Sequence, residues 1–353
     1  MSRFVTKTVD AISPYVPGEQ PRDKKYVKLN TNENPYFPTK YGVEKIDTGF
    51  LNNLKLYSDP EAKALTSAVA TQYGVTPDCV LMTNGSDEAL AFIFKAFFEG
   101  NNLAYSDITY GFYSVYSLLF NVNSTVIPLC EDFTQNLTAF ESFDGHIIMA
   151  NPNAQTGLLE KINDIEKLLK KDRLVVVDEA YADFSYTSVK GLLHNYDNLL
   201  VVGTFSKSRS LAGARLGFVI GNKELIADIK NVKYSFNPYN VNSVTQALGE
   251  SVILDRAYFS DCLEKVIATR ERSKKVLEKL NFTFLDSKAN FILANSNEIG
   301  GEKLYLALKD KGFLVRHFSD PRITDYVRIT IGTDKEMDLL FDAISEILKE
   351  QTK

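Results

Sequence analysis

The pattern of hydrophobic and polar positions divides this chain of 353 residues into three parts. In the central part, from residue 60 to 245, short apolar runs recur at 80–83, 146–150, 174–177, 199–202 and 217–220. These runs predict strands, and continuous runs without polar alternation are typical of strands buried on both faces of a parallel sheet. Apolar residues three and four positions apart predict helices between the strands, at 62–74, 89–98 and 162–169. Alternating strands and helices predict an α/β domain with a mostly parallel sheet.

The two ends of the chain have different patterns. Residues 1–40 contain five prolines, which exclude long helices and predict an irregular segment. This segment is either a surface arm or an arm that folds over a site, where Tyr15 and Asn32 offer hydrogen bonds. After a long helical stretch at 241–280, four strands (282–285, 290–294, 313–315, 326–331) and two helices (302–311, 335–348) predict an α+β unit. We therefore predict an N-terminal arm over 1–40 that joins the small domain, a large domain over 41–250 and a small C-terminal domain over 251–353.

Composition and charge exclude several classes of protein. The formal net charge of -5 argues against a nucleic-acid partner, because such proteins usually carry a basic excess. Cys79, Cys130 and Cys262 are too far apart for a CxxC metal site and odd in number, and the three histidines lack metal-site spacing. The N-terminus shows no apolar signal segment, and no run approaches the ~20 apolar residues of a membrane span. We expect a cytoplasmic protein without a metal or a membrane partner.

Polar residues that suit a phosphorylated cofactor follow several predicted strands. Lys207 lies just past an apolar run, between hydroxyl residues, and Arg215 follows eight positions later. Asp178 directly follows another run, at the strand end where ligands bind in open α/β sheets. A turn at Gly85 and a helix start capped by Ser86 predict an anion site, because free backbone N–H groups and the helix dipole would face the anion.

Together these residues supply what pyridoxal phosphate (PLP) requires of a protein. Lys207 offers the amine, Asp178 a carboxylate for the pyridine nitrogen, and Tyr110 a ring that stacks on the cofactor. The phosphate donors would be the Gly85-Ser86 turn, Thr204, Ser206 and Arg215. Each residue has an ordinary alternative: a solvated loop lysine, a helix-capping carboxylate or a packed aromatic side chain. Their occurrence together in this order favours PLP chemistry.

Six segments carry a resemblance to a known family: Leu29–Pro35, Asn84–Glu88, Thr109–Gly111, Asp178–Tyr181, Ser206–Arg215 and Val327–Gly332. In these segments the chain resembles the fold-type I PLP-dependent aminotransferases, and the resemblance runs from about residue 12 to the C-terminus. It implies the α/β PLP-dependent transferase fold (type I), with a helix-flanked, mostly parallel sheet in a large domain and a smaller α+β domain. It also implies a homodimer with shared active sites and amino-group exchange that involves 2-oxoglutarate and glutamate.

The resemblance implies a role for each candidate cofactor residue. Lys207 would form the Schiff base with PLP, Asp178 would pair with the pyridine nitrogen, and Tyr181 would hydrogen-bond the phenolic oxygen. Tyr110 would stack on the ring. The segments that bind the phosphate contain Gly85, Ser86, Asp87, Thr204, Ser206 and Arg215, with Asp87 orienting the turn. Tyr57 would reach the cofactor phosphate of the partner subunit.

The resemblance also implies substrate-binding residues. Arg328 would bind the substrate α-carboxylate, for which a planar guanidinium is suited. Arg316 would bind a distal phosphate of the substrate, and Tyr15 and Asn32 would help to close the N-terminal arm. The alternative for both arginines is an exposed position on a strand. A small amino acid, keto acid or phosphorylated amine is the expected substrate.

The loop Asn153-Ala154-Gln155-Thr156-Gly157 departs from the family pattern. The family usually has asparagine and proline where this chain has Ala154 and Gln155, and that asparagine lies beside the phenolic oxygen of PLP. Either Asn153 supplies this contact after a small shift or Tyr181 carries it alone; we expect Asn153. Three other functions share this pattern: a threonine-phosphate decarboxylase, an aromatic or broad-range aminotransferase, and a degenerate PLP-fold binding protein without activity.

Overall fold

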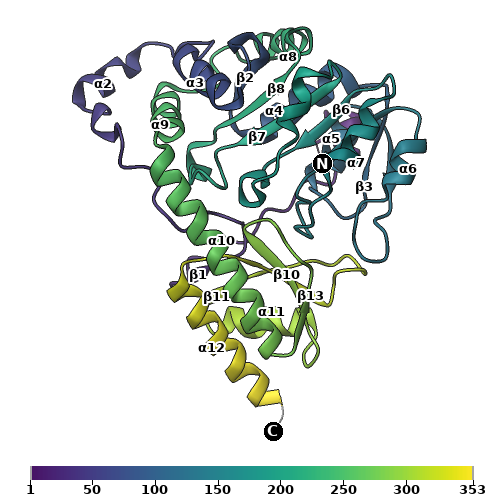
Figure 1. Ribbon diagram of the computed structural model, residues 1–353, viewed down its shortest axis with the longest axis vertical. Coiled ribbons are helices and arrows are strands. Elements are labelled where there is room, and N and C mark those ends of the chain that lie inside the picture. The colour runs from purple at the N-terminus through teal and green to yellow at the C-terminus, as the bar shows by residue number, and fades with distance from the viewer. Residues whose placement is uncertain (1, 352–353) are drawn as a thin grey trace.

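The computed structural model describes residues 2–351, and its largest element is a seven-stranded sheet (Figure 1). The strand order is β2-β8-β7-β6-β5-β3-β4. The strands are β2 (Val80–Thr83), β3 (Asn102–Ser106), β4 (Asn123–Ile127), β5 (His146–Ala150), β6 (Val175–Asp178), β7 (Leu199–Thr204) and β8 (Gly217–Gly221). β8 runs antiparallel to both of its neighbours, whereas the other pairs are parallel. The prediction of a mostly parallel sheet is therefore confirmed.

Helices cover both faces of this sheet, which explains the apolar runs. On one face, residues such as Val176 and Leu200 pack against α4 (Gly85–Ile93), α5 (Phe112–Leu119) and α8 (Lys223–Phe236). On the other face, the alternate residues pack against four helices: α3 (Lys63–Tyr73), α6 (Leu137–Ser142), α7 (Ile162–Leu169) and α9 (Ser243–Leu254). Every residue of β6, β7 and β8 is buried, as expected for strands with two covered faces.

Two local predictions were wrong, and one edge strand was missed. The helix predicted over 89–98 begins earlier, at Gly85, and changes to a π turn over Phe94–Phe98. Its N-cap residue is Asn84 rather than the predicted Ser86. The Asn84 N–H donates a hydrogen bond to the Glu88 carboxylate at 2.7 Å. The edge strand β4 was not predicted, because four of its five residues are exposed and no apolar run marks it.

The C-terminal part forms a second, antiparallel sheet in the order β12-β13-β10-β9. Its strands are β9 (Phe282–Phe284), β10 (Phe291–Ser296), β12 (Arg316–His317) and β13 (Tyr326–Thr330). α10 (Arg256–Lys279), α11 (Gly301–Asp310) and α12 (Asp334–Gln351) pack with this sheet around one hydrophobic core. The predicted strand 313–315 is split: Phe313–Leu314 is β11, and β12 begins at Arg316.

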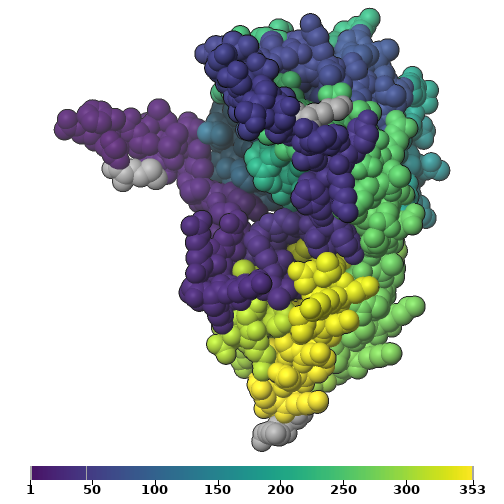
Figure 2. All heavy atoms as spheres, turned by 90° about the vertical axis from the view of Figure 1, so that its left-hand side faces the viewer, coloured from purple at the N-terminus to yellow at the C-terminus, as the bar shows by residue number. Residues whose placement is uncertain are grey.

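The N-terminal segment contacts both parts of the molecule. Its short strand β1 (Val27–Lys28) pairs in parallel with β11, beside the small sheet. The first helix, α1 (Lys7–Ala11), has no buried residue, and the segment that carries it projects from the body in Figure 2. The remaining short elements are α2 (Thr48–Asn52) and the 3-10 turns Val43–Lys45, Asn53–Lys55, Pro77–Cys79, Ala182–Ser185, Val189–His194 and Ala212–Ala214.

Between residues 2 and 351, no helix combines the length and the hydrophobicity that a membrane span requires. The same residues contain no group of three or more histidine, cysteine, aspartate and glutamate side chains arranged to hold a metal ion.

Candidate active site

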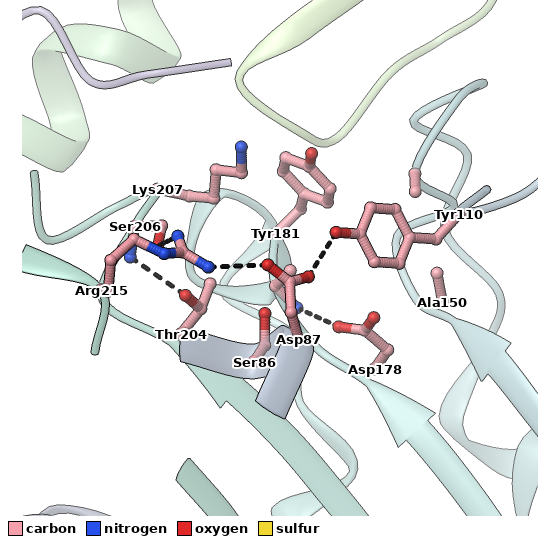
Figure 3. Close-up of a pocket in the computed structure, with 12 residues that line it drawn as sticks. Ser86, Asp87, Tyr110, Ala150, Asp178, Tyr181, Thr204, Ser206, Lys207 and Arg215 are labelled. Carbon is pink, nitrogen blue, oxygen red and sulfur yellow. Dashed lines mark hydrogen bonds and ion pairs between the residues drawn. The ribbon is translucent and has the colours of Figure 1, made fainter. Parts of the chain in front are cut away.

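A cavity lies at the carboxyl ends of the central parallel strands. Nine predicted cofactor residues line it, together with three alanines (Figure 3). The nine are Ser86, Asp87, Tyr110, Asp178, Tyr181, Thr204, Ser206, Lys207 and Arg215. Parallel strands bring their carboxyl ends to one edge, so residues separated by more than a hundred positions meet there.

Asp178 is the last residue of β6 and points into the cavity (Figure 3). Its carboxylate accepts hydrogen bonds from the Tyr113 hydroxyl at 3.0 Å and the Ala180 N–H at 3.1 Å. Burial raises the pKa of Asp178 to about 6, although both hydrogen bonds oppose the shift. No cation among the described residues lies within ion-pair distance of this carboxylate. A positively charged group in the cavity would therefore stabilise the ionised form of Asp178.

Lys207 follows β7 by three residues, and its side chain extends to the mouth of the same cavity. The Nζ atom donates a hydrogen bond to the carbonyl oxygen of Thr31, at 2.9 Å, in the N-terminal segment. It also lies 5.7 Å from the centre of the Tyr181 ring. Because its hydrogen-bond partner is a neutral carbonyl, the lysine amine is not held by a carboxylate.

Arg215 and Asp87 form an ion pair at one end of the cavity, with 2.6 Å between Nη2 and Oδ2. Asp87 also accepts a hydrogen bond from the Tyr110 hydroxyl at 2.5 Å, so it connects the arginine to the predicted stacking ring. Ser206 N–H donates to the Thr204 hydroxyl at 3.1 Å, which fixes the two hydroxyl residues next to each other. Figure 3 shows these side chains gathered near the start of α4.

Two glycines allow this end of the cavity to form. Gly85 has a φ of +81°, and a Cβ atom there would lie 2.5 Å from Nη2 of Arg215. Gly217, in β8, approaches the turn from the other side, and its Cβ would lie 2.4 Å from the Ser86 nitrogen. The glycines therefore bring the arginine, the turn and the start of α4 into contact.

Besides Gly85, two predicted cofactor residues do not line the cavity, Asn153 and Tyr57. Asn153 is buried, and its amide is fully used by the backbone: Oδ1 accepts from the N–H groups of Gln155 and Thr156 in its own loop, and Nδ2 donates to the Ile108 carbonyl after β3. The contact expected of Asn153 does not fit this geometry, since Ala154 and not Asn153 lines the cavity. Tyr57 is 83% exposed and stacks on Tyr239, with 4.5 Å between the ring centres.

A second cavity joins the first, and the four predicted substrate residues line it. The two cavities share Tyr110, Ala154, Tyr181 and Lys207. Arg316, Arg328, Tyr15 and Asn32 line the second. Its described lining contains three cationic side chains and no carboxylate, so it has the charge to attract an anionic ligand.

The N-terminal segment forms one wall of this second cavity. Arg316 donates to the carbonyl oxygens of Val16 and Pro17, and the Tyr15 ring stacks on Phe112 with 4.5 Å between the ring centres. Asn32 is fully buried and donates from Nδ2 to the Tyr181 hydroxyl at 3.0 Å. The segment therefore lies over the cavities, which favours the second of the two alternatives, an arm folded over a site.

Sequence reasoning missed two contacts of the predicted residues. The first is the hydrogen bond from the Tyr113 hydroxyl to the Asp178 carboxylate. Tyr113 lies three residues after Tyr110, in the first turn of α5, and this position could have marked it as a site residue. The other is the Thr31 carbonyl that accepts from Lys207, which no sequence pattern marks because it is a backbone atom.

The residues around the first cavity fit PLP, the cofactor that the resemblance implies. Asp178 is a buried carboxylate without a cationic partner, as a protonated pyridine nitrogen requires. At the other end, the N-terminus of α4, two hydroxyl residues and Arg215 provide donors for a phosphate. The lysine lies between these two ends.

The chain belongs to the family described as aminotransferase class I and II, whose model matches residues 24–344. Within that class, several relatives over nearly the full chain are histidinol-phosphate aminotransferases. It is 49% identical to the histidinol-phosphate aminotransferase of Brachyspira hyodysenteriae, over 99% of this chain and all of that protein. It is 44% identical to the histidinol-phosphate aminotransferase of Clostridium beijerinckii, over the whole of this chain and 99% of that protein.

A solved structure shows the same fold over nearly the whole chain. The histidinol-phosphate aminotransferase of Sinorhizobium meliloti, in complex with pyridoxal-5'-phosphate, superposes with a TM-score of 0.86 and covers 99% of each chain at 21% identity. The predicted fold class, a fold-type I aminotransferase with an α/β large sheet, is therefore confirmed.

Proposed function

We propose that the protein is a PLP-dependent aminotransferase that exchanges an amino group between L-histidinol phosphate and 2-oxoglutarate, giving imidazole-acetol phosphate and L-glutamate. The observation that carries the proposal is the second cavity, whose described lining includes Lys207, Arg316 and Arg328 and no carboxylate. Every substrate of this reaction is an anion, through a carboxylate or a phosphate group. The names of relatives that are 44–49% identical over the full chain support the same substrate pair.

The cofactor would be held by the first cavity. Asp178 would keep the ring nitrogen protonated, and Ser86, Thr204, Ser206 and Arg215 would hold the phosphate, with Gly85 leaving room for the arginine. Tyr110 would pack on the ring and Tyr181 would donate to the phenolic oxygen without help from Asn153. When bound, PLP supplies an electron sink for the substrate Cα.

Lys207 would attach the cofactor and then move the proton at the substrate Cα. A lysine acts as a base only in its neutral form, which burial and nearby cations favour. Closing the arm over the cavities would exclude water from this proton transfer. The hydrogen bond from Lys207 Nζ to the Thr31 carbonyl supports this role, since it joins the arm to the lysine.

The substrate would lie between Arg328 and Arg316. Arg328 would bind the α-carboxylate of glutamate, and Arg316 would bind the distal anionic group, with Tyr15 and Asn32 on the arm side. A homodimer would complete the site, because Tyr57 is 83% exposed beside its stacking partner Tyr239 and would enter a partner's cavity. It lies in a segment with the exposed apolar residues Leu51, Leu54 and Leu56, which a partner subunit would cover.

The test is a substrate screen on PLP-loaded protein. We expect glutamate and imidazole-acetol phosphate to give histidinol phosphate at a rate well above that for phenylpyruvate. If phenylpyruvate is aminated and imidazole-acetol phosphate is not, the protein is an aromatic or broad-range aminotransferase. Release of CO₂ from O-phosphothreonine would instead identify a threonine-phosphate decarboxylase.

A further inference from the structure

Arg328 is a half-buried cation whose hydrogen-bonding capacity is only partly used. Its guanidinium lies between the rings of Phe291 and Phe318, 5.1 and 5.2 Å from their centres. Nη2 has only a long contact, 3.5 Å, with the Asn30 carbonyl, and the buried Nε has no partner among the described residues. The burial lowers the pKa of Arg328. A guanidinium with a buried, unpartnered donor gains a hydrogen bond and charge pairing from an anionic ligand.

The side chain of Gln155 is the one side-chain hydrogen-bond acceptor for Arg328 in the described part of the chain. Nη1 donates to Gln155 Oε1 at 2.9 Å and to the Ala154 carbonyl at 3.0 Å. The backbone of Gln155 is held by a hydrogen bond from its own N–H to Asn153 Oδ1 at 2.8 Å. The amide therefore has a defined position beside the guanidinium, in the lining of the second cavity.

The orientation of this amide follows from chemistry. Arginine has donors only, so the oxygen of Gln155 must face it and the NH₂ group must point away. No hydrogen bond of that NH₂ group occurs within the described residues, and the side chain lines the cavity. Gln155 thus both holds the guanidinium and presents two N–H donors beside it.

We propose that Gln155 is a specificity-determining residue that orients Arg328 and donates a further hydrogen bond to the substrate carboxylate. The inference rests on the proposed function, in which Arg328 binds that carboxylate. An apolar residue at this position would leave the Ala154 carbonyl as the one acceptor for Nη1 of Arg328. The substrate carboxylate would also lose the hydrogen-bond donor that the Gln155 amide offers. Gln155 therefore adds affinity for carboxylate ligands without taking part in proton transfer.

The test measures binding of glutarate, a dicarboxylate that has no amino or keto group to react, to the PLP-loaded enzyme by calorimetry. Gln155→Met keeps the length of the side chain and removes both hydrogen bonds, and we expect the glutarate Kd to rise about tenfold. Gln155→Glu places a carboxylate on Arg328 and repels the ligand, so its Kd should rise further. The KM for glutamate should follow the Kd, while kcat changes little.

Unfolding temperature and cofactor absorbance provide the structural control, and both should match those of the wild type. The inference is overturned if Gln155→Met binds glutarate as the wild type does, or if Gln155→Glu binds it as well as Gln155→Met. Because glutarate binding requires no turnover, these outcomes are separate from the substrate screen. Failure to aminate imidazole-acetol phosphate would refute the proposed substrate and leave the comparison of Gln155 variants interpretable.

Discussion

Replacing Asp178 with asparagine should stabilise the cofactor-free protein at neutral and alkaline pH. The carboxylate is 4% exposed and lacks a cationic partner, and burial raises its pKa from 3.8 to about 6. A difference of about 2 pH units corresponds to about 3 kcal/mol, at about 1.36 kcal/mol per unit. Since the folded state binds the proton more tightly, ionised Asp178 costs the folded state this free energy above pH 6. Below the ordinary pKa of 3.8, Asp178 is protonated in both the folded and the unfolded state, so this cost to folding disappears.

Urea unfolding of both cofactor-free proteins between pH 4 and 8.5 measures this effect. Asp178→Asn keeps the shape of the side chain, and the Tyr113 hydroxyl can donate or accept, so its contact survives. The advantage of the variant should be small near pH 4, grow up to about pH 6 and stay near 2–3 kcal/mol above it. With PLP present the order should reverse, because the ring nitrogen loses its anionic partner. A pH-independent difference between the two cofactor-free proteins would refute the reasoning.

Three further predictions concern other residues of the site. Lys207→Ala should abolish activity and the visible absorbance of lysine-bound PLP; retention of that absorbance in the variant would contradict the assignment of Lys207. Mixing inactive Tyr57→Ala and Lys207→Ala subunits should restore about a quarter of wild-type activity, since half of the dimers are hybrids with one intact site each; no recovery after subunit exchange would exclude a shared site. Gly217→Ala should lower the free energy of unfolding by about 1–3 kcal/mol and weaken PLP binding, because its Cβ meets the turn backbone. Gly213→Ala, with open space around its Cβ, is the matched control and should change stability by less than about 0.5 kcal/mol.

The central strands were predictable because burial on two faces leaves a strong signal. The valines of β6 contact helices on both sides of the sheet, so no polar residue can interrupt the run. The end of the run then identifies Asp178, since a carboxylate directly after a buried strand lies where ligands bind. In contrast, β4 has one covered residue in five, and an exposed edge strand does not require apolar residues.

The loop after β5 shows why the role of Asn153 could not be predicted. Asn153 is the asparagine next to Ala154, and its residue type alone suits a contact to the phenolic oxygen. The backbone of the loop, however, needs an acceptor for the N–H groups of Gln155 and Thr156, and Asn153 supplies it. A short polar side chain often satisfies its own loop first, and this competition depends on backbone geometry that sequence patterns do not give.

The charges of the two cavities explain how an acidic protein can bind anionic ligands. The chain has a net charge of -5, yet the second cavity is lined by Lys207, Arg316 and Arg328 without a carboxylate. In the first cavity the charged groups lie at opposite ends, with the buried Asp178 carboxylate at one end and the Arg215 guanidinium at the other. A cofactor with a cationic ring and an anionic phosphate matches this arrangement in one orientation only, because reversing it would place the phosphate against Asp178. The unpaired Asp178 carboxylate, which lowers the stability of the cofactor-free protein, would thus also determine how the cofactor lies.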